Sequence, residues 1–251
     1  MEQDVHIRNN GSRHRSSLFT LMTTQQTHQN PIPATGIILA GGKSTRMGQD
    51  KAFVEMGSRP LIERVLERVQ PVVAETIVVT NNLQPYVHLP ARLVPDVVTG
   101  RGPLVGIYSG LQAARHDLAI VVACDMPFIR PDLLRFMLAQ SAGYDVVMPR
   151  ATISAPSRGL HDRPVAGPTA KAKGLHPLHA VYRRTCLPAI ERLIDSNDLR
   201  VIAFLAGVRV RYLEADEITR FDPQQRSFFN INTPEEWERA HAMESDETSL
   251  C

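Results

Sequence analysis

The sequence has few cysteines, little net charge and no long apolar run. Its three cysteines, Cys124, Cys186 and Cys251, are odd in number and far apart, which argues against a disulfide framework or a CxxC metal site and is typical of a reducing compartment. No apolar stretch approaches the roughly 18 residues of a membrane span, and residues 1–33 lack the apolar core of a signal peptide. The net charge of +2 is too small for general nucleic-acid binding. We therefore expect a cytoplasmic protein that binds neither membranes nor nucleic acid.

Two common phosphate-binding motifs are also missing. There is no GxxxxGK[ST] sequence and no GxGxxG sequence, so neither a P-loop NTPase nor a dinucleotide-binding enzyme is favoured. No Ser-His-Asp or Cys-His arrangement points to nucleophilic catalysis by a side chain.

The chain does contain short, continuously apolar segments that alternate with amphipathic ones. Continuous apolar runs are typical of parallel strands covered on both faces, and their alternation with helices predicts an α/β, three-layer, Rossmann-like fold with a mostly parallel sheet and helices on both faces. The predicted strands are residues 36–40, 76–80, 119–123, 145–148, 179–182 and 208–213. The predicted helices are residues 60–69, 131–139, 187–194, 199–206 and 234–242, and residues 102–114 are predicted to be a loop that runs into a helix.

Composition along the chain predicts one folded domain with polar additions. Residues 1–34 are rich in Gln, Asn, Ser, Thr and His and are expected to be a disordered extension. Residues 35–243 form the single expected domain, within which the Pro- and Gly-rich residues 150–174 are predicted to be an exposed loop insertion. Residues 244–251 are expected to be a flexible tail.

A glycine-rich turn with cations follows the first predicted strand. Leu39, Ala40, Gly41 and Gly42 open the run LAGGKSTRMGQDK, which ends at Lys51. Paired glycines let backbone N–H groups approach an anion, and the cationic side chains of the run can bind phosphate oxygens. The segment therefore predicts a triphosphate site at the carboxyl edge of the sheet, where open α/β folds bind ligands.

This run resembles the LAGGxSxRMGxxK signature of the MobA-like nucleotidyltransferases, and the resemblance extends over roughly residues 35–242. It implies that the three-layer, Rossmann-like fold is a nucleotidyltransferase fold, and that Leu39, Ala40, Gly41 and Gly42 hold the nucleotide. It further implies that Arg46 and Lys51 hold the phosphates as catalytic residues.

Two further motifs carry candidate metal ligands. Asp125 follows a predicted central strand in the run CDMP, and the resemblance implies that it binds Mg²⁺ and the nucleotide and takes part in catalysis. On its own it could equally be a turn residue before Pro127. Asn230 and Asn232 alternate in the run NINTPEE, so their amide oxygens can face one side of an extended segment and complete the metal shell. Helix capping is the alternative for this cluster.

The resemblance also assigns the nucleotide's base. Asn81 and Asp96 lie at strand ends, and Gly102, Pro103 and Leu104 belong to a GPLxGI loop; in the family these positions contact the guanine nucleotide. Each could separately be a turn. His176 and His179 lack a nearby acidic or cysteine partner, so we interpret them as packing or acceptor-contacting residues and not as metal ligands.

The implied reaction is transfer of GMP from GTP to the phosphate of molybdenum-loaded molybdopterin, with release of pyrophosphate, as part of molybdenum cofactor biosynthesis. Mg²⁺ is the implied cofactor. Molybdenum insertion enzymes or acceptor enzymes are the implied transient protein partners. Two alternatives remain open at this point. One is a cytidylyltransferase for molybdopterin or another phosphorylated acceptor; the other is a non-catalytic, GTP-binding regulatory protein.

Overall fold

A computed structural model describes residues 30–41, 50–151 and 174–248 of the chain. All structural statements below concern these residues. Arg46 and Gly42 lie outside them, as do most of the predicted N-terminal extension and of the predicted loop insertion.

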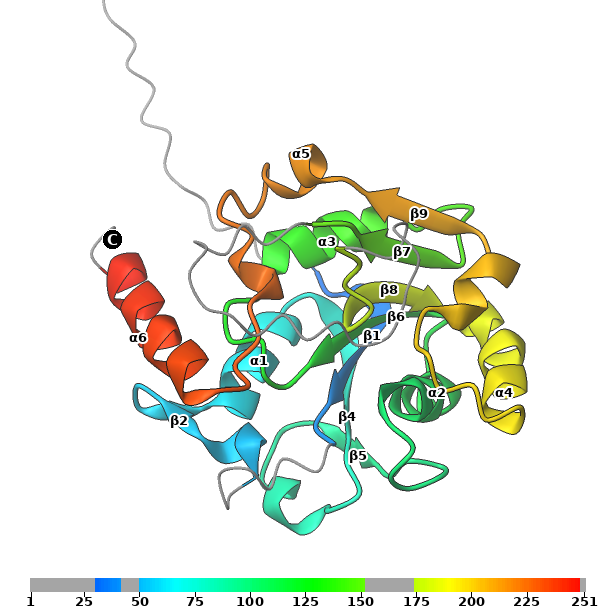
Figure 1. Cartoon of the computed structure of the whole chain (residues 1–251), viewed down its shortest axis with the longest axis horizontal. Helices are drawn as coiled ribbons and strands as arrows, with labels where there is room; N and C mark the ends of the chain where they lie inside the picture. The colour runs from blue at the N-terminus through cyan, green and yellow to red at the C-terminus, as the bar shows by residue number, and fades with distance from the viewer. Residues whose placement is uncertain (1–29, 42–49, 152–173, 249–251) are drawn as a thin grey trace, which may run out of the picture.

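A seven-stranded sheet forms the centre of the molecule (Figure 1). All neighbouring strands in it are parallel except for β8, which is antiparallel to both β6 and β7. This mostly parallel sheet confirms the predicted fold class. Its order is β5 (Arg92–Val94), β4 (Val73–Val79), β1 (Ile32–Leu39), β6 (Leu118–Ala123), β8 (His179–Arg183), β7 (Val146–Pro149) and β9 (Val210–Leu213).

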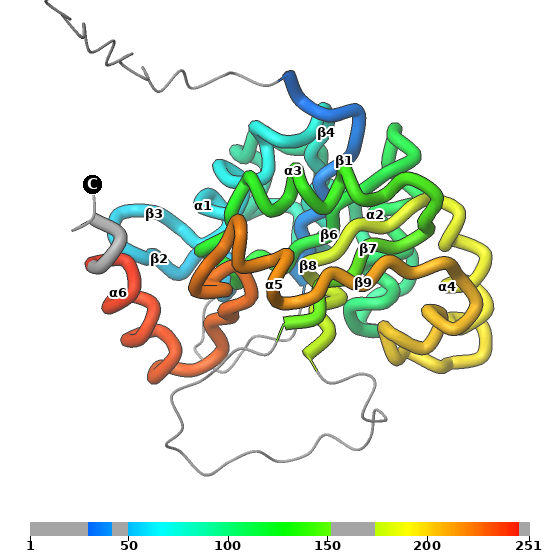
Figure 2. The backbone as a smooth tube through the Cα atoms, turned by 90° about the horizontal axis from the view of Figure 1, so that it is seen from above, coloured from blue at the N-terminus to red at the C-terminus, as the bar shows by residue number. Residues whose placement is uncertain are grey.

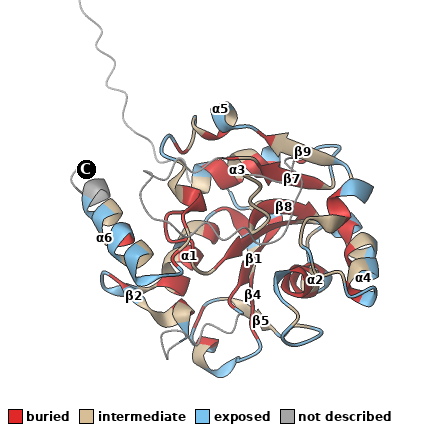
Figure 3. Ribbon diagram, viewed as in Figure 1, coloured by how far each residue is buried: buried red, intermediate tan, exposed pale blue. Residues whose placement is uncertain are grey.

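Helices cover both faces of the sheet, because alternate residues of its buried strands point to opposite sides. Ile38 contributes to the core beneath α1 (Leu61–Val69) and α3 (Pro131–Ala139). Ile37 contributes to the core beneath α2 (Pro103–Ala113) and α4 (Leu187–Asp195). The central strands β1, β6, β8 and β7 are largely buried in this three-layer arrangement, whereas the edge strands β5 and β9 are mostly half-buried (Figure 3).

The N-terminal boundary and one helix differ from the prediction. β1 begins at Ile32, whose N–H donates to the carbonyl of Val72 at 2.9 Å, and Ala34 is fully buried. The folded part therefore starts before Thr35. The helix predicted for residues 199–206 is wrong: it is replaced by turns and the 3-10 helix η6 (Ala203–Gly207). Its apolar residues still pack against the α2 and α4 side of the core.

The C-terminal helix is longer than predicted. α6 spans Pro234–Thr248, so the expected flexible tail is helical up to that point. Tertiary contacts hold its end: Glu244 pairs with Arg64 of α1 at 2.5 Å, and the Met243 carbonyl accepts a hydrogen bond from Arg226 at 2.9 Å. These contacts dock α6 beside the hairpin of β2 (Glu55–Met56) and β3 (Arg59–Pro60) (Figure 2). Across the described ranges, no helix combines the length and apolarity that crossing a membrane requires.

Candidate nucleotide and metal site

The predicted site residues leave the sheet at one edge. The N–H of Cys124 donates to the Leu39 carbonyl at 3.1 Å, which joins the ends of β6 and β1. The N–H of Ala40 donates to the Val79 carbonyl at 2.9 Å, and the N–H of Thr80 donates to the Val94 carbonyl at 3.0 Å. The segments that follow β6, β1, β4 and β5 are therefore adjacent at the carboxyl edge, where open α/β sheets bind ligands.

Lys51, Asp125 and Asn232 meet at this edge although they are far apart in sequence. The Lys51 ammonium donates to the Asp125 carboxylate (Oδ2) at 2.6 Å and to the Asn232 amide oxygen at 2.7 Å. The Lys51 and Asp125 side chains are only 16% and 15% exposed, so solvent screens their attraction less than it would at the surface. Three residues that were predicted separately thus form one cluster.

The second oxygen of Asp125 suits a hard cation. Asp125 Oδ1 is buried and has no hydrogen-bond partner among the described residues. A buried carboxylate oxygen without a partner is costly, and a divalent cation would satisfy it. No group of three acidic, histidine or cysteine side chains that could hold a metal occurs in the described ranges. The unpartnered carboxylate oxygen and the nearby amide oxygen of Asn232 are donors that fit a hard divalent cation, which prefers oxygen ligands.

The segment that carries the asparagines is fixed against Asp125. The N–H of Ile231 donates to the Asp125 carbonyl at 3.1 Å, which places the run from Asn230 to Asn232 alongside it. Asn230 is half-buried and Asn232 is exposed apart from its contact with Lys51.

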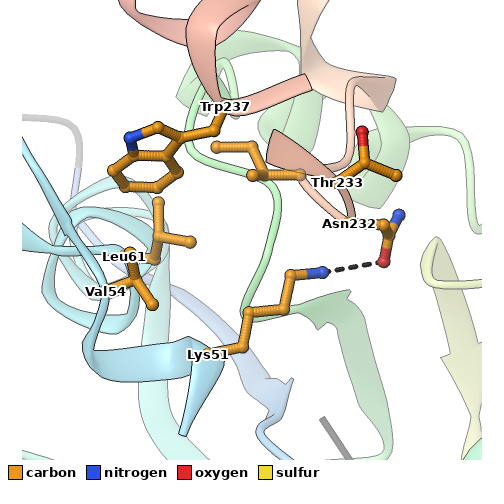
Figure 4. A pocket seen from close by; sticks show the side chains of 7 residues that line it. Lys51, Val54, Leu61, Asn232, Thr233 and Trp237 are labelled. Carbon is orange, nitrogen blue, oxygen red and sulfur yellow. Dashed lines mark hydrogen bonds between the residues drawn. The ribbon is translucent and has the colours of Figure 1, made fainter. Parts of the chain in front are cut away.

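A capping box holds Asn232 at the start of α6. Glu236 accepts hydrogen bonds from the N–H groups of Asn232 and Thr233 at 2.6 and 3.0 Å, and the Thr233 hydroxyl accepts from the Glu236 N–H at 3.2 Å. Thr233 and Glu236 thus form a reciprocal capping box, so helix capping accounts for part of this cluster. Figure 4 shows the Lys51 side chain extending toward Asn232, while the indole of Trp237 lies next to Leu61 on an apolar wall of the same pocket.

Asn81 and Asp96 form a second cluster on the other side of β1. The Asn81 amide donates to Asp96 Oδ2 at 2.8 Å, and its oxygen accepts from the Asp96 N–H at 3.1 Å. Asp96 Oδ1 is buried without a described partner. A Cβ added at Gly106 would lie 3.2 Å from Leu39 and 3.5 Å from that same oxygen, so Asp96 lies beside the first turns of α2 and the end of β1. Burial raises the pKa of Asp96, and the hydrogen bond from Asn81 opposes this effect.

Gly41 and Gly102, next to these clusters, have open surroundings within the described chain. A Cβ at Gly41 would meet no atom within 4 Å, and its φ is not positive, so neither packing nor backbone conformation within the described chain requires glycine there. Gly102 has a φ of 84° and precedes Pro103 without providing a capping side chain. The N-terminal N–H groups of α2, which begins at Pro103 and buries Leu104, therefore lack a side-chain cap.

The two histidines pack within the protein. His179 is fully buried, its ring meets Phe228 edge-on at 5.0 Å, and neither of its ring nitrogens has a partner among the described residues. Burial lowers its pKa to about 3, so the ring is neutral. The His176 ring is tilted against the same phenyl ring, with the centroids 4.3 Å apart, and one of its ring nitrogens lies 3.1 Å from the Ala151 carbonyl. This arrangement agrees with the packing interpretation.

Sequence reasoning missed one contact at this edge. The buried Tyr86 hydroxyl donates to Asp50 Oδ2 at 2.8 Å and lies 3.3 Å from the Ala40 carbonyl. Asp50 lies in the glycine-rich run, directly before Lys51. The acidic side chain beside that cation was the only sequence feature that could have indicated a role for Asp50. Nothing in the sequence pairs it with Tyr86.

Comparisons with known proteins identify the family. Residues 36–210 match the MobA-like NTP transferase domain. The chain is 40% identical over 212 residues to a probable molybdenum cofactor guanylyltransferase of Pelotomaculum thermopropionicum, covering 84% of this chain and 94% of that protein. It is 36% identical over 210 residues to the molybdenum cofactor guanylyltransferase of Desulfosudis oleivorans, covering 83% and 94%.

A solved structure shows the same architecture. The crystal structure of molybdopterin-guanine dinucleotide biosynthesis protein A from Archaeoglobus fulgidus superposes with a TM-score of 0.67 at 28% identity, covering 84% of this chain and 99% of that one. Since the family match covers more than half of the sequence and the relatives match over nearly their full length, the chain belongs to the MobA-like NTP transferase domain family.

Proposed function

We propose that this protein transfers GMP from GTP to the phosphate of molybdenum-loaded molybdopterin, forming the guanine dinucleotide cofactor and releasing pyrophosphate. The observation that carries the proposal is the cluster of Lys51, Asp125 and Asn232 at the carboxyl edge of the sheet. It combines a cation for phosphate with acidic and amide oxygens for a divalent metal. The names of the relatives at 36–40% identity supply the donor and the acceptor.

The nucleotide would occupy the edge from β5 to β6. Open space at Gly41 allows its backbone to approach a phosphate closely. The uncapped start of α2 at Gly102, Pro103 and Leu104 supplies N–H donors and the positive end of the helix dipole. Asp96 Oδ1, which Asn81 holds in place through the other carboxylate oxygen, can accept from an N–H or O–H of the nucleoside. Leu39 provides an apolar contact beside it.

The metal would be held by Asp125 together with the amide oxygens of Asn230 and Asn232. When bound, Mg²⁺ supplies positive charge to the phosphate oxygens of the nucleotide. Its proposed place agrees with the buried, unpartnered Oδ1 of Asp125.

The protein's own side chains align the reactants and offset charge. An oxygen of the acceptor phosphate attacks the α-phosphorus of GTP, forming a new P–O bond. The bond from that phosphorus to the bridging oxygen of the β-phosphate breaks, and pyrophosphate leaves with the electron pair. Lys51 donates hydrogen bonds to the phosphate oxygens as charge accumulates, and Arg46 is proposed to do the same. The acceptor phosphate is already ionised at neutral pH, so no side chain needs to act as a general base.

The test is to incubate the purified protein with Mg²⁺, GTP and molybdenum-loaded molybdopterin and to identify the product by mass spectrometry. We expect the guanine dinucleotide and one pyrophosphate per product. A parallel reaction with CTP should give far less product. Asp125→Ala should retain the circular dichroism of the parent and lose pyrophosphate release. Turnover with CTP alone, or GTP binding without any pyrophosphate, would refute the proposal.

A further inference from the structure

Tyr86 connects the beginning and the end of the glycine-rich run. It ends the 3-10 helix η3 (Gln84–Tyr86) and is fully buried. Its hydroxyl donates to Asp50 Oδ2 at 2.8 Å and lies 3.3 Å from the carbonyl of Ala40, the residue that follows β1. One hydroxyl thus connects the end of the first strand with the residue before Lys51.

The Asp50 carboxylate is held from two sides. Its Oδ1 accepts the Ala52 N–H at 3.2 Å and thereby caps the 3-10 helix η2 (Lys51–Phe53). Its Oδ2 accepts from Tyr86, whose ring also packs against Phe53 with centroids 4.7 Å apart. Burial and the nearby Asp50 carboxylate both raise the pKa of Tyr86, so the phenol remains a hydrogen-bond donor at all physiological pH values.

Lys51 lies between these two anchored residues. The hydrogen bonds to Asp50 and Ala52 fix the backbone of the turn from which the lysine side chain starts. The ammonium group then reaches Asp125 and Asn232 at 2.6 and 2.7 Å. An error of about 1 Å in placing such a group can reduce the rate of a phosphoryl-type transfer by about a hundredfold.

We propose that Tyr86 is a positioning residue whose hydroxyl, through Asp50, holds Lys51 at the phosphate and metal site. The proposal rests on the proposed function, because it assumes that Lys51 binds the phosphates of the nucleotide. It assigns Tyr86 no contact with substrate.

The chain allows a direct readout of the Lys51 position, since it has only four lysines, at positions 43, 51, 171 and 173. Selective labelling with ¹³Cε-lysine gives one Cε NMR signal for each lysine and leaves the ammonium groups intact, and the Lys51 signal is identified by its loss in Lys51→Met. Tyr86→Phe removes the hydroxyl and keeps the ring. Asp50→Asn weakens the same contact from the exposed side and serves as a second variant if Tyr86→Phe does not fold.

Tyr108→Phe is the matched control, because the Tyr108 hydroxyl also donates to a carboxylate, that of Glu191, at 2.8 Å. This contact joins α2 to α4 and involves none of the proposed site residues. Tyr86→Phe and Asp50→Asn should move the Lys51 signal toward the position of a solvated lysine and weaken binding of GTP with Mg²⁺ about tenfold. Tyr108→Phe should change neither.

The outcomes separate the positioning role from the proposed function. An unchanged Lys51 signal in folded Tyr86→Phe would overturn the positioning role. A shifted signal with unchanged GTP affinity would support the mechanical link but reject the assignment of Lys51 to the phosphates. Tyr86→Phe is also introduced into Lys51→Met. If it lowers GTP affinity there by the same factor as in the parent protein, the hydroxyl acts independently of the lysine and the proposal is overturned.

Discussion

Replacing Lys51 with methionine should strengthen binding of a divalent metal in the absence of nucleotide, even though it should abolish transfer. The Lys51 ammonium lies 2.6 Å from Asp125 Oδ2 and 2.7 Å from the Asn232 amide oxygen. Both side chains are proposed metal ligands. The ammonium and a metal ion therefore compete for the same carboxylate, and removing the ammonium removes the competitor.

The size of the effect follows from the geometry. At an effective dielectric constant of about 20, two unit charges 2.6 Å apart attract by about 6 kcal/mol before desolvation is subtracted. A hydrogen bond to a charged group typically contributes a net 1.5–3 kcal/mol, roughly. Because Lys51 and Asp125 are largely buried, a value within this range is expected. We therefore expect metal affinity to rise roughly ten- to a hundredfold in Lys51→Met.

The assay is titration with Mn²⁺, with free ion measured by electron paramagnetic resonance. Arg150→Met is the control for net charge, because Arg150 pairs with Glu214 at 2.9 Å and is not a proposed site residue. It should leave Mn²⁺ affinity nearly unchanged. If Lys51→Met bound Mn²⁺ no more tightly than the parent protein, the lysine would not occupy the place of the metal and the reasoning would be refuted.

Three further predictions concern the core and the nucleotide site. Gly110→Ala would place a Cβ 2.5 Å from Ile37 Cγ2, so it should destabilise the protein by about 1–3 kcal/mol; an unchanged urea midpoint would contradict this packing. The folded-state pKa of His179 is lowered to about 3, whereas a histidine in the unfolded chain has a pKa of about 6.5. Between these two values only the unfolded state is protonated, so the free energy of unfolding should fall as the pH drops below about 6.5. By pH 4 this loss of unfolding free energy should reach about 3 kcal/mol. Urea unfolding at several pH values should show it in the parent protein and not in His179→Leu. Asp96→Asn should weaken GTP binding about ten- to a hundredfold. Thermal stability should be kept or raised, because the substitution removes the charge from a buried carboxylate that has one oxygen without a described partner. Unchanged GTP affinity in calorimetric titration would exclude Asp96 from the site.

The central strands of the sheet were predictable because they are buried on both faces. Continuous apolar runs predicted β1, β4 and β6 to within a few residues. The direction of β8 was not predictable, since an apolar run does not indicate whether a buried strand is parallel to its neighbours. The pairing of β6 with β8 shows the antiparallel direction, because the start of β8 at His179 lies opposite Val122 and its end at Arg183 lies opposite Leu118.

Errors in the sequence prediction occurred where tertiary contacts outweigh local pattern. Residues 199–206 have apolar side chains near helical spacing, but Asp198 accepts hydrogen bonds from the backbone and side chain of Arg200, which favours a turn at the start of the segment. The end of α6 is polar and was expected to be flexible. The pairing of Glu244 with Arg64 in α1 stabilises it, and that partner is 180 positions away in the sequence.

The candidate site was predictable only in part, for a similar reason. Motif resemblance selected Lys51, Asp125 and Asn232, and the structure brings all three into contact. Tyr86 carried no such signal, because its role depends on a hydrogen bond to Asp50 across 36 positions. A tyrosine after a proline is compatible with many turns, so only coordinates could connect it to the lysine.

The contact between Lys51 and Asp125 has a consequence for how ligands bind. For a metal to take Asp125, the ammonium must move, and the phosphates of a nucleotide provide its new partner. Each ligand therefore removes an obstacle to the other, so metal and GTP should bind with positive coupling. Reciprocity requires that GTP raise metal affinity by the same factor by which the metal raises GTP affinity. Part of this coupling comes from the lysine itself, and that part must disappear when Lys51 is replaced, even though the metal alone then binds more tightly.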